Sequence, residues 1–314
     1  MKFPTRNLVA VVAAGGLLAA PAAFAADNAS AGGPMEGQGR AVVTVLQGDR
    51  IPEQALQIKI NGKESNVTGW TPLRGSQSNL EFVVLIDDGA RSSLGSQLND
   101  VAKFIDDLPP NAKVAVAYMM NGQATFNGPL TTDHAAVERK LHLPLSGMLG
   151  VNASPYFCLS DLAKHWPSRD PDARREVVMI TDGIDNYEPR YDPNDPYVLA
   201  AIQDAVRAHL IVYSIYWRNS GRFDRTMYAA DTGQNLLSEV TAATGGNAYW
   251  EGYGNPVSLQ PFFADIHHRL SNQYELDFLA PLGSKPQIED LKLKLNQSAK
   301  VEAPQQVYVQ VARQ

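Results

Sequence analysis

The fold of this chain is decided by the stretch Phe82-Val83-Val84-Leu85-Ile86-Asp87-Asp88-Gly89 and by a second stretch of the same kind, Val177-Val178-Met179-Ile180-Thr181-Asp182-Gly183. Each is a continuous apolar run that ends in a loop containing aspartate. Apolar runs without polar alternation fit strands that are covered on both faces, as in a parallel sheet flanked by helices. Such sheets bind ligands at the carboxyl ends of their strands. We therefore predict that Asp87 and Asp182 converge on one crevice.

The sequence around these two runs alternates between strand and helix patterns. An apolar helical face follows the first run, and further apolar helical patterns precede and follow the second. Strands that alternate with amphipathic helices indicate an α/β fold with helices on both sides of the sheet. We therefore expect a doubly wound, mostly parallel sheet between Leu80 and Leu270. The first helical face consists of Leu94, Leu98, Val101, Ile105 and Leu108.

Strand patterns without helices flank this block on both sides. The run Leu56–Ile60 alternates apolar and polar residues and ends on Asn61-Gly62, a strong hairpin signal. The tail returns to strand character from about Tyr274. We expect the two ends of the chain to pair into one small β module.

The first residues form a targeting segment. Lys2 and Arg6 precede an apolar run over Leu8–Ala25, and Ala23-Phe24-Ala25 supplies small residues for cleavage. No later stretch is long and apolar enough to span a bilayer. The alanine-rich leader is typical of bacteria, so we expect export to a periplasm or out of the cell, with no membrane contact after cleavage. The expected organisation is a signal peptide over 1–25, a disordered leader over 26–39, an N-terminal β segment over 40–78, an α/β domain over 79–272 and a C-terminal β segment over 273–314.

Composition narrows the class of protein. The chain has 314 residues and a formal net charge of −6, so it offers no general electrostatic reason to bind nucleic acid. Cys158 is the only cysteine, which excludes an internal disulfide. A lone cysteine on an apolar helix face is usually a small buried hydrophobe. Stability must therefore come from the core, which a chain of this length can form.

The block from Asn79 to Leu270 resembles the von Willebrand factor A family. The likeness is carried by Ile86-Asp87, by Ile180-Thr181-Asp182-Gly183 and by Thr244-Gly245-Gly246 before a last strand. This resemblance implies the fold of that family and a protein-binding role, often through a bound magnesium.

The flanking segments resemble a bacterial, secreted group within that family, the "VWFA-related" proteins. These proteins carry an N-terminal strand region with a Gly-Lys turn, here Asn61-Gly62-Lys63. They also carry a C-terminal continuation, here Leu270-Ser271-Asn272-Gln273-Tyr274-Glu275-Leu276. The resemblance therefore extends to the β module expected from the two chain ends.

The family resemblance implies a magnesium site built from three loops. The family pattern after the first strand is Asp-x-Ser-x-Ser, and the matching positions here are Asp87, Gly89 and Arg91, so both hydroxyls are lost. The second loop offers Ser154 where the family has a threonine, and the third offers Asp182. Magnesium prefers hard oxygen donors in a near-octahedral array. The remaining donors predict a degenerate site without a cofactor.

Two arrangements of the first loop are open at this stage. The Arg91 guanidinium could fold back onto Asp87 and Asp182, because it pairs bidentately with carboxylates, and its charge would disfavour a divalent ion. Alternatively, a longer loop could bring Ser92 or Ser93 into the vacated places. The alternative magnesium site would then consist of Asp87, Ser92, Ser154 and Asp182.

The segment after Asp182 is acidic and rich in tyrosine, and its spacing fits no defined calcium loop. An ordinary solvated loop pinned by prolines is one interpretation. A recognition patch beside the crevice is the other, since loops on a rigid scaffold often carry binding residues. The predicted partner-binding residues are Asp87, Arg91, Ser154, Asp182, Asp185, Tyr187 and Tyr191.

Enzymatic motifs are missing from the sequence. There is no nucleophile elbow and no dinucleotide-binding fingerprint after the first strand. The adjacent His267 and His268 would point to different sides of a helix and could not chelate one ion together.

We therefore expect an exported, non-enzymatic module that binds a protein partner and carries a degenerate metal-ion-dependent adhesion-type site. Two alternatives remain. One is a magnesium-dependent adhesion module whose metal is completed by a partner carboxylate. The other is an uncharacterised hydrolase that uses the acidic crevice.

Overall fold

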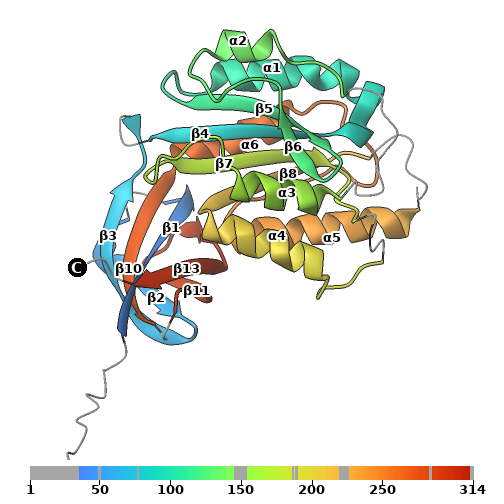
Figure 1. Cartoon of the computed structure of the whole chain (residues 1–314). Helices are drawn as coiled ribbons and strands as arrows, with labels where there is room; N and C mark the ends of the chain where they lie inside the picture. Colours follow the sequence, from blue (N-terminus) through green and yellow to red (C-terminus); the bar gives the residue numbers. More distant parts are fainter. Residues whose placement is uncertain are drawn as a thin grey trace, which may run out of the picture. The chain divides into compact units, whose positions relative to one another are not determined.

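The structure is a computed structural model (Figure 1), and it describes residues 35–48, 51–75, 78–144, 154–185, 187, 190–218, 226–282 and 285–311, without the side chains of Met35, Arg91, Ser92 and Leu282. The predicted signal peptide and the first part of the predicted leader lie outside the described residues. No described helix is long and apolar enough to cross a membrane.

A six-stranded sheet forms the centre of the α/β domain, in the order β6-β5-β4-β7-β8-β9. Neighbouring strands are parallel throughout, except that β6 runs antiparallel to β5. All eight residues of β4 are buried, which explains why its sequence shows no polar alternation. The strands are β4 (Leu80–Asp87), β5 (Lys113–Met120), β6 (Gln123–Phe126), β7 (Arg174–Thr181), β8 (Leu210–Tyr216) and β9 (Ala248–Tyr249).

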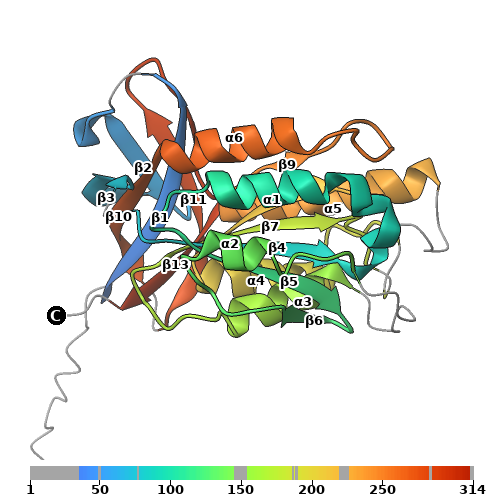
Figure 2. The same cartoon turned by 90° about the horizontal axis from the view of Figure 1, so that it is seen from above.

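Helices cover both faces of this sheet, as expected for a doubly wound domain. The face with α1 and α6 is turned toward the viewer in Figure 2, and it contains Val101, Phe104 and Phe263 in one apolar cluster. The opposite face packs against α3, α4 and α5. The predicted fold class is thereby confirmed. The helices are η3 (Asp88–Gln97), α1 (Leu98–Asp107), α2 (His134–Glu138), α3 (Pro155–Lys164), α4 (Pro196–Arg207), α5 (Met227–Thr244) and α6 (Gln260–Ser271), with a short η1 (Glu53–Ala55) before β2.

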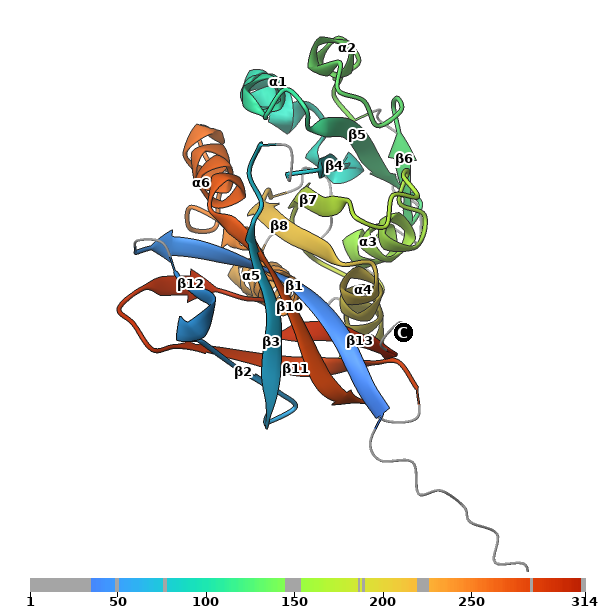
Figure 3. The same ribbon diagram turned by 90° about the vertical axis from the view of Figure 1, so that its left-hand side faces the viewer.

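The two chain ends form a closed antiparallel barrel, which we call the terminal barrel (Figure 3). Its strands follow the order β10-β3-β2-β11-β13-β1, and pairing of β10 with β1 closes the ring, while β12 extends one end of β1. Val43, Ile58 and Phe278 belong to its core. The strands are β1 (Met35–Gln47), β2 (Leu56–Ile60), β3 (Lys63–Pro72), β10 (Gln273–Leu282), β11 (Gln287–Leu295), β12 (Lys300–Glu302) and β13 (Gln306–Val311).

The strand β1 begins at Met35, inside the segment predicted to be a disordered leader up to residue 39. Its first residues pair with β10, and Gly37–Gly39 pair with β13 as well. A Cβ atom on Gly39 would collide with the Phe278 ring, so the glycine allows that ring to lie over the strand. A small, glycine-rich sequence gave no strand signal, although it is used here for close packing.

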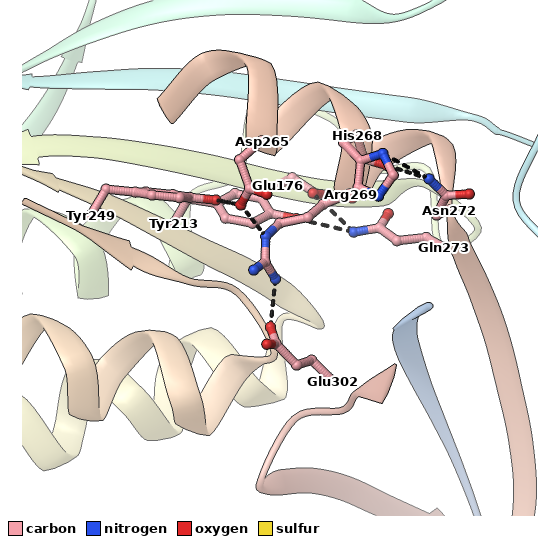
Figure 4. A network of polar contacts seen from close by, with 9 residues as sticks. All are labelled: Glu176, Tyr213, Tyr249, Asp265, His268, Arg269, Asn272, Gln273 and Glu302. Carbon is pink, nitrogen blue, oxygen red and sulfur yellow. Dashed lines mark hydrogen bonds and ion pairs between the residues drawn. The ribbon is translucent and has the colours of Figure 1, made fainter. Parts of the chain in front are cut away.

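A network of buried and partly buried polar groups joins the terminal barrel to the α/β domain (Figure 4). Arg269 of α6 donates hydrogen bonds to Asp265, at 2.6 Å, and to Glu302 of β12, at 2.5 Å. Gln273 of β10 donates to the Tyr213 hydroxyl at 3.1 Å and to Glu176 at 3.4 Å. Buried groups of this kind need their partners, so the network fixes how the two parts pack.

Candidate functional site

The crevice predicted from the sequence lies where β4 and β7 end side by side. Ile86 pairs with Ile180 in the parallel ladder, so Asp87 and Thr181 follow at the same edge of the sheet. Asp87 and Asp182 are nearly inaccessible to solvent, with 0% and 3% of their surface exposed. The strand ends thus bury both aspartates at the carboxyl end of the sheet, and of the two only Asp87 lines the small cavity there.

The carboxylate of Asp87 is held by hydrogen bonds from its neighbours. One oxygen accepts from the backbone N–H of Gly89 at 2.8 Å, and the other accepts from the Thr181 hydroxyl at 2.5 Å. Thr181 Oγ1 also accepts from the N–H of Gly183 at 3.2 Å. Sequence reasoning missed Thr181, although a hydroxyl at the last position of an apolar strand was a visible signal.

Asp182 shapes the turn that follows β7. Its carboxylate accepts from the N–H of Ile184 at 3.1 Å, and Gly183 takes a φ of +68°. A Cβ atom on Gly183 would lie 2.5 Å from Leu237 and 2.7 Å from the Gly233 carbonyl oxygen. Only glycine fits there, because both the backbone angle and the closeness of α5 exclude a side chain.

Ser154 acts as the N-cap of α3. Its hydroxyl accepts from the N–H of Tyr156 at 3.3 Å, and only 1% of its surface is exposed. Serine is a favoured N-cap because it satisfies a free helical N–H. The predicted donor of the second loop is therefore in place, although it already serves the helix.

Tyr156 connects α3 to the turn after β7 and was not singled out in the sequence. Its hydroxyl donates to the Gly183 carbonyl at 2.6 Å. Burial, together with the charges of Asp185 and Asp182, holds the pKa of Tyr156 well above its ordinary value. The phenol therefore stays protonated and links α3 to the turn after β7.

The space left in the crevice is a cavity of about 10 Å³. This volume is close to the minimum that holds one water molecule. Cys158 lies at its wall, and burial raises the pKa of this thiol, which agrees with its predicted role as a buried apolar residue. The lining residues are Asp87, Asp88, Met119, Asn121, Gly122, Ser154, Pro155 and Cys158.

The described donors do not fit a hydrated magnesium ion. Both Asp87 oxygens accept hydrogen bonds from within the protein, and magnesium usually keeps several waters, for which about 10 Å³ gives no room. Among the described residues, no group of three or more His, Cys, Asp or Glu side chains is arranged to hold a metal.

The two arrangements proposed for the first loop are tested only at Ser93. Its hydroxyl donates to the Ala90 carbonyl at 2.5 Å and accepts from Trp217 Nε1 at 2.9 Å, so it does not replace a missing ligand. The side chains of Arg91 and Ser92 lie outside the described part of the chain. The Arg91 ion pair and the Ser92 ligand therefore both stay predictions.

The predicted partner-binding residues of the loop after β7 divide into buried and exposed ones. Asp185 is fully buried and accepts from the N–H of Tyr187 at 2.9 Å, so it supports the loop and does not face a partner. Tyr187 and Tyr191 have 52% and 38% of their surface exposed. The partner-contact role of these three residues stays a prediction, and among them the two tyrosines have the exposed surface that such a contact needs.

Exposed apolar side chains gather at this same edge of the sheet. They lie at the end of β5, in the loop after β7 and the first turn of α4, at the start of α5, and in the loop between β9 and α6. These are the connections at the carboxyl ends of the strands. Among the described large apolar residues that are exposed, only Val311 lies elsewhere. We call this set the apolar rim: Met120, Tyr187, Tyr191, Tyr197, Leu199, Met227, Tyr228, Trp250, Tyr253 and Val257.

Contacts within the apolar rim hold several of its rings in place. Tyr187 and Tyr197 meet edge to face at 5.4 Å between ring centroids, and Phe157 packs against Tyr197 at 4.9 Å. The Tyr191 hydroxyl donates to Glu239 at 2.6 Å. Aromatic pairs of this geometry add stability beyond the area that they bury.

Comparison with known proteins gives structural neighbours only. No protein-family model and no curated protein matches the sequence. An aerotolerance-related membrane protein from Bacteroides fragilis is similar over 61% of this chain and 98% of its own, with 14% identity and a TM-score of 0.42. The BatB protein from Bacteroides thetaiotaomicron is similar over 61% and 97%, with 14% identity and a TM-score of 0.43.

The von Willebrand A domain of SpRpn10 is also similar. It covers 59% of this chain and 94% of its own length, with 11% identity and a TM-score of 0.39. The family that the sequence resembles is thus represented among the structural neighbours.

Proposed function

We propose that this protein is a non-enzymatic binding module that recognises a protein partner through the apolar rim. The observation that carries the proposal is the concentration of exposed aromatic and methionine side chains at one edge of the sheet. Exposed apolar side chains concentrated on one side of a protein often mark an interaction site. Tyr, Trp and Met are also enriched at the core of protein interfaces.

The order within the rim supports the same proposal. Side chains that are already fixed lose little conformational freedom when a partner binds, and this saves free energy of association. Tyr187, Tyr197 and Tyr191 have such fixed positions through ring contacts and the Glu239 hydrogen bond. The buried Asp87 and Asp182 then act as supports of the surface.

The location of the protein is part of the proposal. A positively charged start, an apolar run and the Ala23-Phe24-Ala25 cleavage signal favour export, to a periplasm or beyond the cell. The donor set supports the further proposal that binding does not depend on magnesium. We therefore expect no change in melting temperature with millimolar magnesium, since a ligand that binds only the folded state raises stability. A clear rise would favour the magnesium-dependent alternative.

Site-specific photocross-linking tests the surface directly. A photoreactive amino acid would replace Tyr228, Tyr187 or Trp250 in turn, and the matched control would carry it at the exposed Val311 of the terminal barrel. We expect discrete protein adducts in cells from the three rim positions and none from Val311. Adducts of equal yield at Val311, or none at any rim position, would contradict the proposal.

A further inference from the structure

A second open region lies at the opposite end of the sheet. A groove of about 880 Å³ runs between the terminal barrel and the amino ends of β7 and β8, and we call it the amino-edge groove. Its volume falls within the range of roughly 300–1,000 Å³ that small-molecule sites occupy. It shares no lining residue with the crevice or with the apolar rim, so it is a separate region.

The barrel wall of the groove presents uncharged hydrogen-bonding groups. Gln306, Tyr308 and Gln310 alternate with buried residues along β13, so they share its outer side. Gln310 pairs across the ladder with Gln38 of β1. Two amides therefore lie next to each other, beside the tyrosine ring.

The other wall ends on His209, directly after α4. His209 takes a φ of +52° at a position where helices usually place glycine. Its imidazole is open to the groove and meets the Tyr308 ring edge to face at 6.4 Å. A strained residue that keeps its side chain in an open site suggests a use for that side chain.

The charged residues of the walls already have partners within the protein. Arg40 lies 3.3 Å from Glu275, 3.4 Å from Asp277 and 3.7 Å from Asp172. Arg175 donates to the Asp170 carbonyl at 3.0 Å. An anionic or cationic ligand would compete with these contacts.

His209 is also uncharged at neutral pH. Although the residue keeps exposed surface, desolvation beside the groove, together with the nearby charges of Arg40 and Arg175, lowers the pKa of His209 to about 4. A neutral imidazole offers one donor and one acceptor.

Uncharged polar side chains are thus the groups that remain available to a ligand. They make no side-chain hydrogen bond to any other residue within the described part of the chain. Amides and hydroxyls both donate and accept, as do the hydroxyl groups of a sugar. These side chains are Gln38, Thr68, Thr71, His209, Gln306, Tyr308 and Gln310.

We infer that the amino-edge groove is a binding site for a neutral carbohydrate, with the Tyr308 and His209 rings against the sugar and the glutamine amides on its hydroxyls. Each strand of the barrel ring pairs with two neighbours over part of its length, and addition of an extended peptide to the barrel is an outcome of the test below. This inference does not depend on the proposed partner of the apolar rim.

Ligand-observed NMR on the full chain tests the inference. The probes are maltotetraose, cellotetraose and chitotetraose at millimolar concentration, with a blocked neutral Ala-Ser tetrapeptide and inorganic phosphate as comparison ligands. We expect saturation transfer to at least one tetrasaccharide and none to the peptide or phosphate. Transfer to none of the sugars, or displacement of a sugar by the peptide or phosphate, would overturn the inference.

Two variants of groove residues test where the sugar binds. Gln310→Ala and His209→Gly should each weaken the sugar that binds by about tenfold, which is about 1.4 kcal/mol. Tyr228→Ala, on the apolar rim, is the matched control and should leave sugar binding unchanged. His209→Gly should also raise the melting temperature, so lost binding cannot be ascribed to unfolding. Undiminished binding in both groove variants would contradict the assignment.

Discussion

Two regions lie at opposite ends of the strands of one sheet. The crevice is at the carboxyl ends of β4 and β7, and the groove is at the amino ends of β7 and β8. The crevice has about 10 Å³ of free space, and the groove has about 880 Å³. In the crevice, Asp87 accepts hydrogen bonds from Gly89 and Thr181. In the groove, uncharged groups such as Tyr308 and Gln310 lack such side-chain partners among the described residues.

This difference shows what the carboxyl edge does in this protein. Sheet topology places ligand sites at that edge. Here the strand ends use their polar groups to hold the loops, and the loops present an apolar outer surface. The room for a small ligand arises instead where the terminal barrel meets the domain.

The largest effect is expected where α5 closes the crevice. A Cβ atom on Gly233 would collide with the Asp182 carbonyl oxygen. We expect Gly233→Ala to lower the free energy of unfolding by about 2–3 kcal/mol, because overpacking forces backbone shifts. Helix propensity alone would predict a gain of about 1 kcal/mol. The sign of the measured change in unfolding free energy therefore distinguishes overpacking from helix propensity.

Urea unfolding measures this effect. Gly254→Ala is the matched control, since a Cβ atom there meets no atom within 4 Å. Equal stability of the two variants would show that the crevice is not tightly closed.

The next effect concerns Glu176, in the polar network that joins the terminal barrel to the α/β domain. Burial raises the pKa of Glu176 to about 6, against an ordinary value of 4.5, despite the attraction of Arg174. The folded state therefore keeps this proton longer than the unfolded state, and stability falls as the pH rises from 4.5 to 6. The shift corresponds to about 2 kcal/mol.

Glu176→Gln should remove this part of the pH dependence. The measurement is the unfolding free energy of both proteins across that pH range, with the exposed Glu251→Gln as control. Parallel pH curves for the wild type and Glu176→Gln would refute the assignment.

The smallest effect concerns His209. Glycine adopts a φ of +52° without the cost of about 1–2 kcal/mol that other residues bear. Part of this gain is offset by the greater freedom of glycine in the unfolded chain. We expect His209→Gly to raise the unfolding free energy by about 0.5–1 kcal/mol in chemical denaturation. A loss of stability would mean that the imidazole is needed for folding.

The sheet was predictable because β4 and β7 carry their signal locally. Continuous apolar runs such as Phe82–Ile86 indicate buried strands without knowledge of any other part of the chain. The positions of Asp87 and Asp182 followed from the same runs.

The closure of the crevice was not predictable in this way. Thr181 meets Asp87 across 94 positions of sequence, and Tyr156 reaches Gly183 from another element. The groove depends on the pairing of β1 with β10, which joins the two ends of the chain. Such contacts depend on the whole fold, and a local pattern does not report them.

A crystal structure from crystals grown with both magnesium and the best-binding tetrasaccharide would test the contrast between the crevice and the groove most directly. We predict a sugar against Tyr308 and His209, and no magnesium ion between Asp87 and Ser154. An ion coordinated by Asp87 and Asp182, with an empty groove, would contradict the account.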